Sequence, residues 1–79
     1  MNTIKNEKEV LRDLGRRIRE FRKMKGWSQE QFSMECGLHR TYIGSIERGE
    51  KNITVLNLIK IKETLGVRIE NLLPETGSS

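Results

Sequence analysis

Short runs of apolar residues at helical spacing, each followed by a glycine, restrict the fold of this 79-residue chain more than any other feature. Apolar residues three and four positions apart predict amphipathic helices, and a glycine just after such a run commonly ends a helix. The glycines at these ends are Gly26, Gly37, Gly49 and Gly66. Because the pattern covers most of the length, we expect an all-α, compact five-helix domain rather than disorder.

The first predicted helix runs from about residue 7 to residue 25 and carries charge opposite its apolar stripe. The stripe steps by three and four from Val10 to Met24, which is the spacing of one helix face. The basic residues on the other side are Arg12, Arg16, Arg19 and Lys23, and Arg17 and Arg22 lie beside them. Most such charge forms a solvated face, so we expect only a minority of these side chains to lie near phosphate.

Two short helices joined at a glycine are predicted between residues 28 and 49. Ser28 followed by Gln31 is a capping-box pattern, in which the serine oxygen accepts from a backbone amide and the glutamine side chain reaches back. Gly37 can take a positive φ without steric cost, which favours a turn there. Ile43 and Ile46 then share one face of the next helix. Together these features form a helix-turn-helix pattern.

The C-terminal third carries more apolar residues than one core-facing stripe requires. Thr54 can cap a fourth helix, which Gly66 ends. Its inward-facing residues are predicted to be Leu56, Ile59 and Leu65, while Val55, Leu58 and Ile61 add apolar surface on other sides. A fifth short helix is expected at residues 68–73. We expect a homodimer whose interface is formed by Ile61, Ile69, Leu72 and Leu73, unless these residues only complete the monomer core.

The two ends of the chain are expected to lie outside the folded domain. We expect an N-terminal tail at residues 1–6, the folded domain at residues 7–73, and a disordered tail at residues 74–79. Residues 73–77 read LPETG, the signal that sortases cleave when they anchor proteins to a cell wall. Anchoring also needs a secretory signal and a hydrophobic tail, and neither is found here. The match is therefore attributed to chance or to an engineered tag.

Cysteine and histidine are nearly absent from the chain. Cys36 is the only cysteine and His39 the only histidine, which excludes a disulfide framework and a multi-cysteine zinc site. No apolar run approaches the roughly 18 residues of a membrane span. We expect a soluble, cytoplasmic protein without a cofactor. Cys36 falls at a packing position and His39 lacks a carboxylate partner at a readable spacing, so we expect no enzyme activity.

The net charge of +4 is concentrated near the N-terminus, because residues 1–40 hold ten Lys and Arg against six acids. Such a basic patch suits a polyanion such as nucleic acid, although this charge is also ordinary for solubility. Charge alone therefore leaves both interpretations open.

The segment from Ser28 to Gly49, SQEQFSMECGLHRTYIGSIERG, resembles the helix-turn-helix of the Xre/Cro/CI family of bacterial and phage regulators. The flanks LGRRIREFRKMKGWS and ITVLNLIKIKETLGV resemble the family's first and fourth helices, so the likeness covers about residues 10–73. Within the family, RTYIGSIERGEKNIT is most similar to the controller proteins of restriction-modification systems. The chain departs at Ser33, where alanine is frequent, and at Ile53, where proline is frequent. The resemblance implies a lambda-repressor-like DNA-binding fold.

A recognition helix places its N-terminal residues at base edges in the major groove, so Arg40, Thr41 and Ser45 are predicted to read bases. Tyr42 is predicted to contact a base or a phosphate, or to lean on the second helix as a surface aromatic. The residues expected at the DNA backbone are Gln29, His39, Arg48, Lys51, Asn52 and Arg17. Glu47 is expected to be structural, paired with a first-helix arginine such as Arg17.

The resemblance implies a transcriptional regulator that binds a double-stranded, pseudo-palindromic operator as a dimer, with recognition helices about 34 Å apart. A controller protein would first activate and then repress its own promoter. The alternatives are another Xre-type repressor and an antitoxin-like module that binds protein. Glu30 resembles an acidic position that some phage activators offer to the sigma subunit of RNA polymerase.

Overall fold

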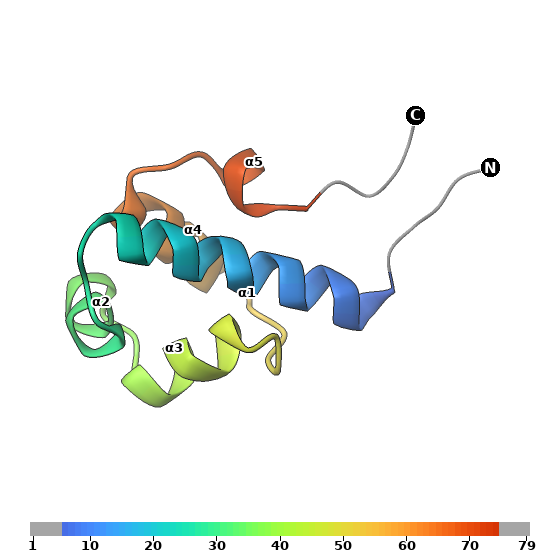
Figure 1. Cartoon of the computed structure of the whole chain (residues 1–79), viewed down its shortest axis with the longest axis horizontal. Helices are drawn as coiled ribbons and strands as arrows, with labels where there is room; N and C mark the ends of the chain where they lie inside the picture. Colours follow the sequence, from blue (N-terminus) through green and yellow to red (C-terminus); the bar gives the residue numbers. More distant parts are fainter. Residues whose placement is uncertain (1–5, 75–79) are drawn as a thin grey trace.

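A computed structural model describes residues 6–74, and these residues form five helices and no strand (Figure 1). The helices are α1 (Glu7–Met24), α2 (Gln29–Cys36), α3 (Arg40–Glu47), α4 (Val55–Leu65) and α5 (Ile69–Leu72). The expected all-α fold with five helices is confirmed. Residues 1–5 and 75–79, which include most of both predicted tails and most of the LPETG match, lie outside the described residues.

The long helix α1 runs through the middle of the domain, with α3 on one side and α5 on the other (Figure 1). α3 packs against both α1 and α2, while α4 packs against α1, α2 and α5. α3 is therefore held from two directions, which fixes its orientation in the domain.

Local sequence signals set the ends of the helices that form the helix-turn-helix. The Ser28 side chain accepts a hydrogen bond from the Gln31 backbone N–H at 3.0 Å, as the capping pattern predicts. The Gln31 side chain does not complete the box, because its amide donates to Glu35 at 2.9 Å. Gly37 ends α2 with φ 74° and donates its N–H to the Ser33 carbonyl. A residue with a Cβ rarely adopts this φ, so glycine makes the turn into α3.

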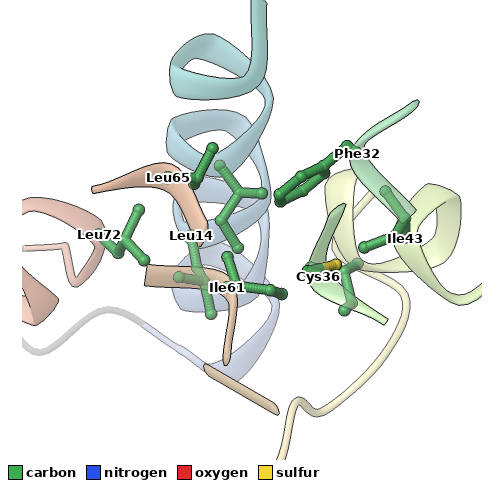
Figure 2. Close-up of a cluster of buried hydrophobic side chains, with 9 residues drawn as sticks. Leu14, Phe32, Cys36, Ile43, Ile61, Leu65 and Leu72 are labelled. Carbon is green, nitrogen blue, oxygen red and sulfur yellow. The ribbon is translucent and has the colours of Figure 1, made fainter. Parts of the chain in front are cut away.

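The hydrophobic core lies where α1, α2, α3, α4 and α5 meet, and Figure 2 shows a large part of it. Its residues are Leu14, Ile18, Phe32, Cys36, Ile43, Ile46, Ile61, Leu65 and Leu72. Every helix contributes at least one of them. Because both isoleucines of α3 are buried here, the packing of the core holds that helix against the rest of the domain.

The face that α4 turns to the core differs from the predicted one. Leu65 is buried as predicted, but Leu56 is 73% exposed and Ile59 is 36% exposed. Ile61 is fully buried in their place, and Leu58 packs partly against the core. α4 carries apolar residues on two faces, so helical periodicity alone cannot say which face meets the core.

Two of the four predicted dimer residues belong to the monomer core. Ile61 and Leu72 are both 0% exposed, so neither side chain has surface to offer a second subunit. For these two the alternative interpretation, completion of the monomer core, is the correct one. Ile69 is half-buried and Leu73 is 43% exposed, so both keep accessible apolar surface.

α1 and α3 approach each other closely at Gly15. A Cβ at this position would meet the carbonyl oxygen of Ile46 and lie 2.7 Å from that of Glu47. Both neighbours are backbone atoms, which cannot move aside as the end of a side chain can. The absence of a side chain at Gly15 thus sets the distance between the two helices.

Candidate nucleic-acid interface

The first turn of α3 presents polar side chains to solvent. Arg40 and Thr41 are exposed, whereas Ile43 and Ile46 are buried on the opposite side of the helix. His39 caps the helix, since its Nδ1 accepts the Thr41 backbone N–H at 3.1 Å. This hydrogen bond leaves Nε2 as the donor of the neutral ring. The structure thus gathers Arg40, Thr41 and His39 at one exposed helix end.

Ser45, which was predicted to read bases, turns away from solvent. Ser45 is only 7% exposed. Its hydroxyl lies 2.9 Å from the Tyr42 backbone carbonyl oxygen and 3.2 Å from that of Thr41. The hydroxyl proton is therefore used within α3. The prediction that Ser45 reads bases is wrong for this arrangement, because a short side chain bonded to its own helix does not project into a groove.

A buried ion pair joins α1 to the end of α3. Arg22 Nε donates to Glu47 Oε2 at 2.7 Å, and Arg22 Nη2 donates to Glu47 Oε1 at 3.0 Å. The side chains are 8% and 3% exposed. Arg22 Nη1 also donates to the Trp27 carbonyl at 2.7 Å, which ties in the loop before α2. This fork-to-fork geometry fixes distance and angle together.

Gln29 extends this network to the start of α2. Its Nε2 donates to Glu47 Oε1 at 3.0 Å, so the first residue of α2 is bonded to the last residue of α3. A Cβ at Gly44 would lie 3.5 Å from Gln29 Oε1 and 3.2 Å from Arg48 Nη1. The bare glycine therefore lets both side chains lie close over α3. The Gln29 side chain therefore braces the end of α3.

Arg17 lies on the wrong side of α1 for its predicted roles. Its Nη1 donates to the Asn71 carbonyl of α5 at 3.4 Å, and α5 lies across α1 from α3. Arg17 is therefore not part of the α3 surface, and the Glu47 partner on α1 is Arg22. Both arginines were candidates from spacing alone. The correct one lies four residues beyond Ile18 and seven beyond Gly15, on the side of α1 that faces α3.

The loop after α3 adds exposed polar and basic groups. Arg48, Lys51 and Asn52 are all exposed, as a surface for a polyanion requires. Arg48 Nε donates to Glu50 Oε2 at 3.0 Å. This hydrogen bond lowers the pKa of the Glu50 carboxyl, so Glu50 stays ionised at neutral pH and offsets one positive charge of the loop.

Asn57 and Glu50 are two members of this surface that the sequence interpretation missed. Asn57 Nδ2 donates to the Tyr42 hydroxyl at 3.0 Å, which links α3 to the first turn of α4. The Tyr42 hydroxyl therefore contacts α4, while its ring packs against the core cluster. A signal for Asn57 was present, because it is the only polar residue between Val55 and Ile59.

The described residues bear on two other kinds of functional feature, a metal site and a membrane-spanning helix. Within residues 6–74 no three His, Cys, Asp or Glu side chains gather where they could hold a metal ion. No helix of that part of the chain has the length and apolar character needed to cross a membrane. Burial raises the pKa of the Cys36 thiol, which disfavours the reactive thiolate.

A short helix with an exposed polar N-terminal turn, locked to the preceding helix and followed by a basic loop, defines a helix-turn-helix domain of the DNA-binding type. The helix-turn-helix family model matches residues 18–72, which is more than half of the chain. The chain belongs to this family, the Xre-type helix-turn-helix DNA-binding regulators.

Its relatives and structural neighbours include controller proteins. The control protein C.BamHI of Bacillus amyloliquefaciens is 46% identical over 63 residues, covering 78% of each chain. The crystal structure of the restriction-modification controller protein C.AhdI from Aeromonas hydrophila has a TM-score of 0.77 and 38% identity, covering 80% of this chain and 96% of that one. The crystal structure of SinR in complex with DNA has a TM-score of 0.72 and 33% identity, covering 75% of this chain and 95% of that one.

Breaking the buried ion pair is expected to cost more stability than breaking an exposed one. Glu47→Gln should lower the free energy of unfolding by about 3–5 kcal/mol, because it leaves the Arg22 charge buried and uncompensated. Glu20→Gln is the matched control, since Glu20 pairs with Arg16 at 3.2 Å in an exposed position and should cost less than about 1 kcal/mol. Urea unfolding measures both. Equal losses would contradict a structural role for the buried pair.

Proposed function

We propose that this chain is a sequence-specific regulator of transcription that binds double-stranded DNA by inserting the start of α3 into the major groove. The observation that carries the proposal is the exposure of Arg40 and Thr41 on a helix whose isoleucines are buried. An arginine can bond guanine O6 and N7 together, and a threonine methyl can meet the methyl group of thymine. Base reading is assigned to these two residues and, through its hydroxyl, to Tyr42.

Contacts to the DNA backbone are assigned to the residues that surround the start of α3 and the loop after it. They are Gln29, His39, Arg48, Lys51 and Asn52. Gln29 stands at the N-terminus of α2, where backbone N–H groups and the helix dipole favour phosphate. These contacts position α3 on the duplex and carry little sequence information of their own.

The proposed regulator is a homodimer that pairs through the first half of α4. Val55 is 72% exposed and Leu56 is 73% exposed, and with Ile59 they form an apolar face that the monomer leaves uncovered. Leu73 adds apolar surface at the end of α5. A two-fold dimer would present two copies of α3 to successive major grooves and therefore prefer a pseudo-palindromic operator.

The similarity to C.BamHI and C.AhdI supports a controller protein of a restriction-modification system. Its proposed action is first to activate and then to repress its own promoter. Such a protein works where DNA is transcribed, so its place is the cytoplasm. Glu30 is exposed in the first turn of α2, where it can meet the sigma subunit of RNA polymerase. We assign no catalysis to the chain, since the family to which it belongs consists of DNA-binding regulators.

Replacing the proposed base-reading arginine should remove selectivity but not the fold. With a duplex selected from a random pool by the wild-type protein, Arg40→Ala should weaken binding by about 5- to 150-fold, corresponding to one bidentate base contact. Arg68→Ala is the matched control, because Arg68 is exposed at the start of α5 and pairs only locally with Glu70. Gel-shift titration against selected and random duplexes gives the ratio. Unchanged selectivity in Arg40→Ala would refute the base-reading role.

Placing a charge on the uncovered face of α4 should separate the dimer. Leu56→Glu is expected to sediment as a monomer, because an ionised carboxylate cannot be buried in an apolar interface without a partner. Met34→Glu is the matched control, since Met34 is 68% exposed on α2 and lies outside the proposed interface. Sedimentation equilibrium reports the mass of both variants. A dimeric Leu56→Glu protein, or a monomeric wild type, would overturn this interface.

Removing the carboxylate beside Arg48 should strengthen DNA binding. Glu50→Gln deletes a negative charge near the proposed phosphate track and frees the Arg48 guanidinium, so affinity should rise about two- to tenfold at low salt and less at high salt. Glu70→Gln removes the same kind of partner from Arg68, at 3.5 Å in α5, and should leave affinity unchanged. Fluorescence anisotropy across a salt series measures both. A similar gain in both variants would show only a net-charge effect.

A further inference from the structure

Tyr42 stands between α3 and α4 with its hydroxyl already engaged. The side chain is half-buried against the core, and its oxygen accepts a hydrogen bond from Asn57 Nδ2 at 3.0 Å. Asn57 is also half-buried and sits in the first turn of α4, where its backbone N–H donates to the Thr54 side chain at 3.1 Å. Both ends of this contact are therefore fixed by the fold.

We propose that Asn57 is a positioning residue for DNA recognition, because it sets the direction in which the Tyr42 hydroxyl can donate. A phenolic hydroxyl carries one proton and accepts through its oxygen. The amide of Asn57 donates to the Tyr42 hydroxyl oxygen. The phenolic proton of Tyr42 therefore points away from Asn57, toward a different partner. Tyr42 then meets DNA as a hydrogen-bond donor.

This polarity restricts what Tyr42 can contact on DNA. Acceptors that a donor can meet are phosphate oxygens, guanine O6 and N7, adenine N7 and thymine O4. The amino groups of cytosine and adenine are donors, which an oxygen that already accepts from Asn57 accommodates less well. The inference rests on the proposed function, in which Tyr42 follows Arg40 and Thr41 along the face of α3 turned to DNA.

The ring is also held before DNA arrives, which reduces the entropy lost on binding. The Tyr42 side chain packs against the core cluster, and the backbone carbonyl of Tyr42 accepts from the Ser45 hydroxyl at 2.9 Å. A hydroxyl that could rotate freely would have to be ordered by the DNA itself. Asn57 thus acts on recognition without having to touch DNA.

A double-mutant cycle tests the coupling, using the duplex that the wild-type protein selects from a random pool. Tyr42→Phe keeps the ring and removes the hydroxyl, and should weaken binding about 5- to 10-fold. Asn57→Ala should weaken it about 3- to 10-fold, and the double variant should bind no more weakly than Tyr42→Phe alone. Asn52→Ala, at an exposed loop position outside the Tyr42–Asn57 hydrogen bond, is the control whose loss of affinity should multiply with that of Tyr42→Phe. Multiplying losses for Asn57→Ala would overturn the inference.

A change of polarity at position 57 gives a second, independent reading. In Asn57→Asp the carboxylate accepts the phenolic proton, so Tyr42 would present an acceptor to DNA. Asn57→Asp should therefore bind DNA more weakly than Asn57→Ala. The gap between them, taken as the ratio of their dissociation constants, should shrink at least threefold when Tyr42→Phe is added to both. The gap that remains measures the repulsion between the carboxylate and phosphate. An unchanged gap would show that Asn57 does not direct the Tyr42 proton.

Two further readouts separate a positioning role from simple stability and from failure of the proposed function. Thermal unfolding should show all seven single and double variants folded at the binding temperature, and the selected-to-random affinity ratio should fall for Asn57→Asp with Tyr42 present. A wild-type protein that selects no duplex would refute the proposed function. A wild-type protein that selects one, with multiplying losses in the cycle, would refute only the role of Asn57.

Discussion

The buried ion pair between Arg22 and Glu47 is the contact on which the geometry of the helix-turn-helix depends. It binds the last residue of α3 to α1 through two hydrogen bonds, and the same two side chains hold the Trp27 carbonyl and the Gln29 amide. Four segments are thereby tied to one charged cluster: α1, the loop before α2, the start of α2 and the end of α3. Gln29, proposed to contact the DNA backbone, and α3, proposed to contact bases, are consequently held in one fixed relation.

An ion pair suits this position better than apolar packing alone because it fixes an angle as well as a distance. Apolar side chains of similar volume would fill the space, and in other proteins such replacements have been neutral or stabilising. They would not hold the Gln29 amide, however, and they could not bond the Trp27 carbonyl. Gly15 complements the pair, since the close approach of the two backbones there leaves α3 little freedom to slide along α1. We therefore interpret the pair as a device for orientation more than for stability.

The sequence predicted the helices and their ends well, because caps and glycines act locally. Ser28, Gly37 and Thr54 behave as their chemistry requires wherever the chain places them. Predictions were wrong where the sequence offered two equivalent arrangements and only the packing of the folded chain decides between them. α4 has two apolar faces, and α1 has several arginines that the sequence alone could pair with Glu47. The prediction for Ser45 was wrong for a different reason. A serine within a helix can donate its hydroxyl to a backbone carbonyl of the same helix, and residue spacing does not show this.

α4 carries both of the proposed contacts that lie beyond the helix-turn-helix itself. Asn57 faces the Tyr42 hydroxyl on α3, while Val55, Leu56 and Ile59 leave an apolar face open to solvent. These residues occupy the same two turns of one helix, so a second subunit packed on that face would also steady Asn57. In the proposed dimer, subunit pairing and the polarity of Tyr42 are then set by one rigid element. Dimer formation would thus double a reading surface that the fold of each subunit already holds in place, and a pseudo-palindromic operator would meet two matched copies of α3.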